Sequence, residues 1–213
     1  MKTDDFAALL AAQVAPVPPR TVSRRLRQAL AAGLPLAALI MLCGYGLRHD
    51  LVQAMFWPMF WIKLLFSVCI GTAGYVMVQR LARPGVAVRG AWLGAVLPVL
   101  LMWALALYRW HLMPGDARMP DLMGQTWRSC VFNIALISLP LLAAGLLALR
   151  GMAPTRPAAA GAAAGALAGG AGAAVYALHC PELTAPFLAV WYVLGIALPV
   201  LAGALLGPRL LRW

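Results

Sequence analysis

Six apolar segments of about twenty residues each constrain this chain more than any other feature. They lie at about 29–47, 59–79, 90–108, 130–149, 158–178 and 185–207. A helix of this length crosses the roughly 30 Å hydrocarbon core of a bilayer. The runs are continuous rather than alternating, and in lipid only helices or closed barrels satisfy the backbone hydrogen bonds. The sequence therefore predicts six transmembrane helices.

The composition supports the same class. The chain has 213 residues, of which 63% are hydrophobic and only 11% charged, too few charges to cover a soluble domain of this size. We predict an all-α polytopic membrane protein with two parts, a cytoplasmic N-terminal arm (1–28) and a bundle of six transmembrane helices (29–213). The net charge of +11 is better explained by topology than by a nucleic-acid partner, because the basic residues cluster in short loops without interleaved aromatic residues.

The distribution of Lys and Arg predicts the orientation. With the N-terminus inside the cell, twelve basic residues are cytoplasmic: Lys2, Arg20, Arg24, Arg25, Arg27, Arg80, Arg83, Arg89, Arg150, Arg156, Arg209 and Arg212. Four are on the opposite side: Arg48, Arg109, Arg118 and Arg128. Cytoplasmic loops of membrane proteins carry an excess of basic residues. We therefore expect a multi-pass protein of the bacterial inner membrane, with both termini cytoplasmic.

Residues 1–15 have the pattern of a short amphipathic helix. Asp4 and Asp5 suit the positive N-terminal end of a helix dipole. An apolar stripe follows from Phe6, Leu9, Leu10 and Val14. Such a helix either lies on membrane lipid or docks into a groove of a soluble partner. Two acids and one lysine match anionic lipid poorly, so we favour the partner and assign Asp4, Asp5 and the stripe to partner binding.

Lys63 is the one charged residue inside an apolar segment. It follows Trp57, Phe60 and Trp61 about one turn into the second segment. A lysine so close to the interface usually extends outward among aromatic rings. The alternative is an ion or proton site. We expect the outward orientation, because no carboxylate lies in mid-segment to pair with it.

Glycine and proline recur inside the segments. Gly161, Gly165 and Gly169 form a small-residue face, which is typical of close helix packing. We expect this face to pack inside the bundle rather than to form a dimer seam. Four segments contain a proline, at positions 35, 98, 140 and 199. We expect kinks at these sites rather than gating hinges.

The four cysteines divide into two kinds. Cys43 and Cys69 have apolar surroundings and are expected to be inert packing residues. Cys130 and Cys180 both fall at the periplasmic boundary, where two nearby thiols can form a disulfide. That bridge is either a permanent staple or a reactive pair. We favour a reactive pair, because His179 adjoins one thiol and Arg128 lies near the other in sequence, and positive neighbours favour thiolate.

The same residues suggest a metal site. Cys130, Cys180 and His179 together offer two sulfur ligands and one nitrogen ligand for a soft metal ion. Their spacing matches no standard zinc motif. We therefore expect no resident cofactor. A transient soft metal ion at Cys130 and Cys180 is the one metal that the pattern leaves open.

The chain resembles a known family, the negative regulator of sigma F family (NrsF). The resemblance extends from end to end and is carried by Met1-Lys2-Thr3-Asp4-Asp5, Trp127-Arg128-Ser129-Cys130 with Asn133 and Ser138, Ala153-Pro154-Thr155-Arg156-Pro157, Tyr176-Ala177-Leu178-His179-Cys180-Pro181-Glu182, and Pro186-Phe187 to Trp191-Tyr192. Cys43 and Cys69 have no counterpart in this pattern.

The resemblance implies a function. Proteins of this family are six-span inner-membrane anti-sigma factors, not enzymes. They hold an extracytoplasmic-function sigma factor on the cytoplasmic side and release it when heavy metal or oxidant reaches periplasmic thiols. Carried over by motif, Cys130 and Cys180 become the sensing pair.

Two other functions remain as alternatives. A small membrane transporter predicts a polar path through the segments, and the apolar segments show almost no polar residues. A membrane thiol-disulfide protein usually has closely spaced cysteines, whereas Cys130 and Cys180 are far apart in the chain.

Overall fold

The computed structural model describes residues 3–12 and 20–212, and every regular element within these ranges is helical. The elements are α1 (Thr3–Ala12), α2 (Thr21–Gly44), α3 (Leu51–Ala54), α4 (Pro58–Leu81), the 3₁₀ turn η1 (Arg89–Trp92), α5 (Leu93–Leu112), α6 (Gly115–Met123), α7 (Trp127–Arg150), α8 (Pro157–Tyr176), α9 (Ala185–Phe187), the π-helical turn η2 (Leu188–Tyr192) and α10 (Val193–Leu210).

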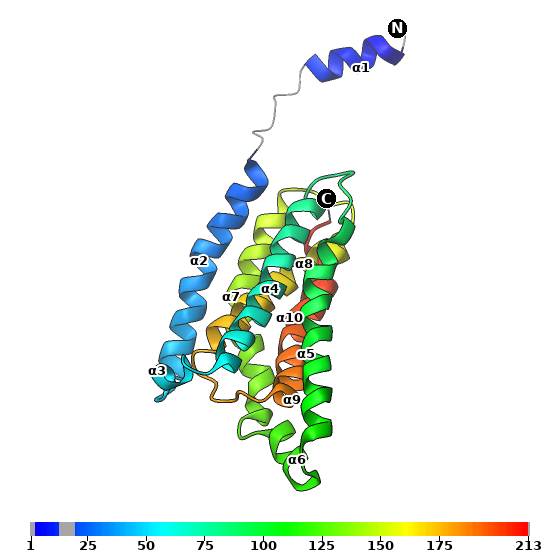
Figure 1. Cartoon of the computed structure of the whole chain (residues 1–213). Coiled ribbons are helices and arrows are strands. Elements are labelled where there is room, and N and C mark those ends of the chain that lie inside the picture. Colours follow the sequence, from blue (N-terminus) through cyan, green and yellow to red (C-terminus); the bar gives the residue numbers. More distant parts are fainter. Residues whose placement is uncertain (1–2, 13–19, 213) are drawn as a thin grey trace.

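Six of these helical stretches are long and apolar enough to cross a membrane, which confirms the six predicted segments. They run alternately up and down (Figure 1), so the two ends of the bundle have different connections. We call one end the arginine end, formed by residues 20–28, 80–92, 148–158 and 207–212. The other is the thiol end, formed by residues 45–58, 111–130 and 177–188.

The first long helix begins earlier than the sequence analysis predicted. It begins at Thr21 rather than near residue 29. Arg, Leu, Gln and Ala are good helix formers, and no proline follows Pro19 before Pro35. The basic cluster from Arg20 to Arg27, which we placed in the arm before the first span, therefore lies mostly in the first two turns of α2.

Helix α8 forms the centre of the bundle. It packs against α10, α4 and α7. The close approach depends on glycine: a Cβ on Gly161 would collide with the carbonyl of Gly203 in α10, and one on Gly170 would collide with the backbone of Gly71 in α4. The small-residue face therefore packs inside the bundle, as predicted.

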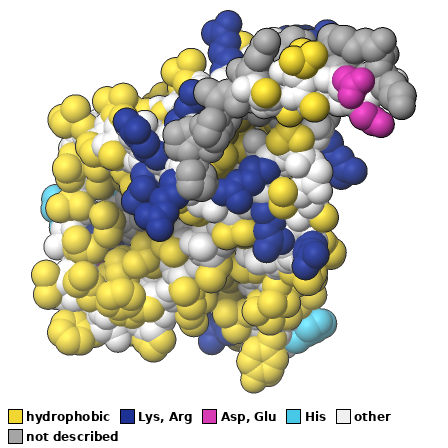
Figure 2. All heavy atoms as spheres, turned by 90° about the horizontal axis from the view of Figure 1, so that it is seen from above, with side chains coloured by type: hydrophobic (Ala, Val, Ile, Leu, Met, Phe, Trp, Pro, Cys, Tyr) yellow, Lys and Arg dark blue, Asp and Glu magenta, His cyan; other side chains and the backbone are white. Residues whose placement is uncertain are grey.

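The outer surface is largely apolar. Many large hydrophobic side chains of α2, α5, α7 and α10 are exposed, as expected for helices that contact lipid. Figure 2 looks onto the arginine end, where basic side chains (dark blue) gather and apolar side chains (yellow) surround them. Pro35, Pro98, Pro140 and Pro199 lie inside α2, α5, α7 and α10, which continue through them.

The N-terminal arm contains the predicted short helix. Helix α1 begins at Thr3 and carries Asp4 and Asp5 in its first turn. Leu9 and Leu10 are 55% and 52% exposed, so their side chains are not buried against the bundle. Val14 and the side chain of Phe6 lie outside the part of the chain that the structure describes.

Candidate functional site

The two thiols that the sequence analysis singled out lie together at the thiol end. Cys130 is in the first turn of α7, and Cys180 is in the connection from α8 to α9. Both residues are fully buried and free. Each thiol is a hydrogen-bonding partner of the other. The fold therefore brings together two sulfur atoms that are fifty residues apart in the chain.

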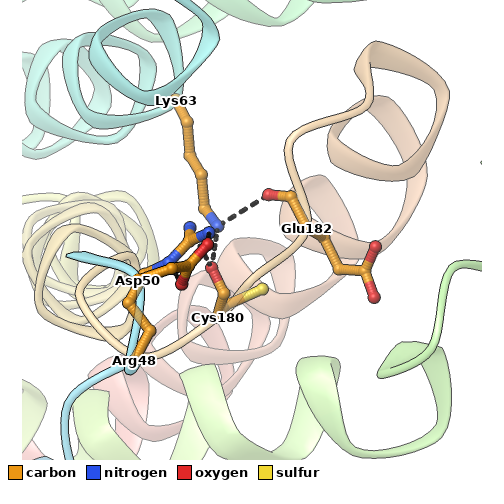
Figure 3. A network of polar contacts seen from close by, with 5 residues as sticks. All are labelled: Arg48, Asp50, Lys63, Cys180 and Glu182. Carbon is orange, nitrogen blue, oxygen red and sulfur yellow. Dashed lines mark hydrogen bonds and ion pairs between the residues drawn. The ribbon is translucent and has the colours of Figure 1, made fainter. Parts of the chain in front are cut away.

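Lys63 holds the connection that carries Cys180. Its ammonium group donates hydrogen bonds to the carbonyl oxygens of Cys180 and Glu182, both at 2.9 Å (Figure 3). It also lies 4.8 Å from the centre of the Tyr192 ring. The residue is 0% exposed. Our expectation that Lys63 extends outward is therefore wrong, because backbone carbonyls satisfy its charge inside the bundle.

Arg48 holds the same connection from another side. Its guanidinium donates to the carbonyl of Cys180 at 3.3 Å and forms a two-pronged ion pair with Asp50, with both N–O distances at 2.7 Å. The backbone N–H of Arg48 also donates to the carbonyl of Leu178 at 3.1 Å. The hydrogen bond from Arg48 holds the pKa of Asp50 below its usual value. The carboxylate is thus a stable partner that keeps the guanidinium in place.

Glu182 connects this segment to the helix that carries Cys130. Its carboxylate accepts hydrogen bonds from the backbone N–H groups of Gln125 at 2.6 Å and Thr126 at 3.2 Å. These groups immediately precede α7, and a negative charge at a helix N-terminus is stabilising. Gly124 has φ +55°, and a Cβ there would lie 2.6 Å from the Glu182 carboxylate. The Glu182 carboxylate can therefore come this close to the backbone only if residue 124 is glycine.

The environment of Cys180 favours its thiolate. Burial by itself raises the pKa of this thiol. The hydrogen bond from Cys130 and the positive charge of Lys63 outweigh burial, so the pKa of Cys180 lies well below its usual value. From the sequence we expected His179 and Arg128 to supply the positive charge. Arg128 is instead exposed, with its guanidinium over the ring of Trp127.

His179 is directed to the end of α2. Its Nδ1 atom is 3.0 Å from the carbonyl oxygen of Gly46, and its ring packs against Tyr45 and Tyr176. Among the described residues, no group of three or more His, Cys, Asp and Glu side chains could hold a metal ion. The predicted site with His179 as a third ligand is therefore not assembled in this structure. Two adjacent sulfurs still fit a soft ion that takes two thiolate ligands.

The remaining predicted residues lie elsewhere. Cys43 is exposed on α2, and Cys69 is half-buried in α4. Exposure in α2 differs from the buried packing that we expected for Cys43. The α1 residues that we predicted to bind a partner belong to the arm and not to the thiol end. The sequence alone did not predict the roles of Arg48 and Glu182, although Glu182 is one of the few polar residues between the fifth and sixth apolar segments.

Comparisons with known proteins agree with the family resemblance of the sequence. The family model described as negative regulator of sigma F matches residues 10–213. A probable anti-sigma-F factor NrsF of Azospira oryzae is 43% identical over 215 residues, covering all of both chains. An anti-sigma-F factor NrsF of Caulobacter vibrioides is 46% identical over 222 residues, again covering all of both chains. No solved structure matches the chain.

Proposed function

This chain belongs to the negative regulator of sigma F family, and we propose that it is an anti-sigma factor of the bacterial inner membrane with both termini in the cytoplasm. It holds an extracytoplasmic-function sigma factor at the membrane and releases it when heavy metal or oxidant reaches the periplasmic thiols. One observation carries the sensing part of the proposal: Cys130 and Cys180 are adjacent, and charged residues of two other segments, Arg48 and Lys63, hold the connection around Cys180. Glu182 of the same connection binds the start of the helix that carries Cys130.

The arm is the proposed contact with the sigma factor. Leu9 and Leu10 are more than half exposed on α1. An amphipathic helix with exposed apolar side chains is suited to a hydrophobic groove on another protein. Asp4 and Asp5 in the first turn add negative charge for basic residues beside such a groove. While α1 fills such a groove on the sigma factor, RNA polymerase cannot bind there.

Helix α2 is the proposed route from the thiols to the arm. It has 24 residues, which corresponds to about 36 Å at 1.5 Å per residue. Gly46 and Arg48, just after its C-terminal end, contact the connection that carries Cys180. The side of α2 packs on α7, where Gly33 lies against Leu141. A shift of either Cys180 or the start of α7 therefore reaches the helix that follows the arm.

Oxidation of the pair has a defined course. The Cys180 thiolate attacks an oxygen of a hydroperoxide, the O–O bond breaks and hydroxide or alkoxide leaves, which gives a sulfenic acid. The Cys130 sulfur then displaces the hydroxyl group as water and forms the S–S bond. The two thiols lose two electrons to the peroxide. A soft metal ion bound by both sulfurs displaces their protons instead, without oxidation.

The test is the membrane-bound fraction of the sigma factor in cells before and after exposure to cadmium or hydrogen peroxide. In the wild type, exposure is expected to release the sigma factor to the soluble fraction. Cys130→Ser with Cys180→Ser should abolish the response, and Cys43→Ser with Cys69→Ser should leave it intact. Unchanged release in the first double variant contradicts the sensing role.

A second measurement separates a sensor from a staple. Cells are quenched with acid, the protein is denatured, and the thiols of Cys130 and Cys180 are counted by mass-tagged alkylation. Thiols that are free at rest and blocked after exposure support the proposal. A pair that is bridged at rest and after exposure is a permanent staple, and the signal must then enter elsewhere.

A further inference from the structure

A groove opens on the side of the bundle between α5 and the pair α8 and α10. Helix α5 packs on α4, on α9 and on η2 but hardly on α8 or α10. In the middle of α5 the Trp103 indole N–H donates to the carbonyl of Ala189 at 2.8 Å. The earlier half of α5 is separated from α8 by a groove of about 520 Å³. The lining side chains, among them Val96, Ala162 and Val193, are all apolar.

A second, polar cleft adjoins this groove at the arginine end. It has a volume of about 440 Å³ and is lined by Arg83 and Arg89 from the connection before α5 and by Arg156 from the connection before α8. Leu81 and Val88 line both spaces, so the cleft and the groove are neighbours. The side chain of Arg80 donates to the carbonyl of Val88 and thereby fixes the loop between the two.

The cleft carries positive charge without compensation. All three arginines are exposed, and none forms an ion pair with any residue in the described part of the chain. The backbone of Arg89 has φ +48°, a conformation that L residues rarely adopt. Arginine side chains bind phosphate oxygens through two parallel hydrogen bonds.

We propose that the cleft and the groove together bind one anionic phospholipid of the inner membrane. The headgroup phosphate contacts Arg83, Arg89 and Arg156, and an acyl chain lies in the groove beside Val96. Both volumes are in the range of small-molecule sites. Basic pockets between transmembrane helices on the cytoplasmic side are suited to anionic headgroups. Trp92, half-exposed at the groove, suits the membrane interface.

The groove distinguishes this ligand from an acidic protein. A soluble partner can reach exposed arginines, but it cannot enter an apolar groove on the side of a bundle that is surrounded by lipid. A free phosphate ion would likewise use the arginines and leave the groove empty. Only a ligand with an anionic head and an apolar chain uses both spaces.

The experiment is native mass spectrometry of the full chain, purified in detergent and titrated with dioleoyl phosphatidylglycerol, dioleoyl phosphatidylethanolamine or glycerol 1-phosphate. The wild type should retain one phosphatidylglycerol in preference to the other two probes. Substituting Arg83, Arg89 and Arg156 together by Gln should weaken this binding roughly a hundredfold, from the typical effect of a basic residue near a membrane. Substituting Arg27, Arg209 and Arg212 by Gln removes equal charge at the same end and should have little effect.

A groove variant tests the acyl chain separately. Ala162→Trp fills the groove and should also abolish retention, whereas Leu147→Trp on the outer face of α7 should not. Retention that depends on the arginines but not on Ala162→Trp overturns the site, since the charge alone then attracts lipid. Equal retention of both lipids overturns it as well. So does a triple arginine variant that retains phosphatidylglycerol but loses the sigma factor, because those arginines then serve the protein partner.

Discussion

The two ends of the bundle hold their charges in opposite ways. At the thiol end Arg48 and Glu182 are buried, as is Lys63 of the adjoining helix α4, and each bonds a segment distant in sequence. At the arginine end most of the basic side chains are exposed, and no ion pair joins them to any described residue. A buried charge must have partners in defined positions, whereas an exposed arginine has little effect on the fold. The thiol end thus requires one geometry, whereas the arginine end leaves its charges available for the contacts proposed above.

Removing Lys63 should produce the largest change. Lys63→Met keeps most of the side-chain volume but leaves the carbonyl of Glu182 without its donor and removes one of two donors from Cys180. Each unsatisfied buried group costs about 1–3 kcal/mol, so we expect a loss of about 3 kcal/mol. The measurement is the free energy of unfolding in mixed micelles. Arg128→Met, an exposed cation at the same end, is the control and should change it by less than about 0.5 kcal/mol.

Removing the Glu182 carboxylate should have a smaller effect. Glu182→Ala takes away the acceptor for the N–H groups of Gln125 and Thr126 at the start of α7. The loss of a helix cap costs about 0.5–2 kcal/mol. Hydrogen exchange should show faster exchange at these amides and through the first turn of α7. Asp116→Ala removes an exposed acid of α6, and an equal effect there would contradict the capping role.

The ion pair of Arg48 and Asp50 should show a smaller, pH-dependent effect. The pKa of Asp50 is held below its ordinary value of 3.8 by the hydrogen bond from Arg48. A lowered pKa means that the pair stabilises the fold above about pH 4 and is lost as pH falls through the lowered value. The wild type should therefore be more stable than Asp50→Asn at neutral pH and converge with it in acid. A constant difference from neutral pH down to about pH 2 would show that the pair has no such role.

The arginine end should show the smallest effect on stability. Arg27→Gln, Arg209→Gln and Arg212→Gln remove exposed charges, so each should change the free energy of unfolding by less than about 0.5 kcal/mol. What should change is topology. The combined variant has a weaker positive-inside bias, and cysteine-accessibility mapping should detect any inverted fraction. A large loss of stability in any single variant would remove the distinction between the two ends.

The sequence predicted the spans well and the site only in part. Span length and apolar continuity are local properties, so the six helices and the glycine face of α8 were found directly. The adjacency of Cys130 and Cys180 followed from topology. The role of Lys63 could not be predicted in this way, because its partners are backbone carbonyls 117 and 119 residues away. Every residue has a backbone carbonyl, so no residue type in the sequence marks such a partner. His179 was misleading, since adjacency in sequence to Cys180 does not direct both side chains to the same place.

The glycine face of α8 has a further consequence for mutational tolerance. The segment from Pro157 to Tyr176 is rich in glycine and alanine and, by composition, looks like one in which any small residue would serve. Backbone contacts at Gly161 and Gly170 leave no room even for a methyl group. In a saturation mutagenesis scan, this segment of α8 should therefore accept fewer substitutions than helix α5, which is more varied in sequence and largely exposed. A segment of simple composition is here one in which the close packing of backbones restricts the allowed side chains most strictly.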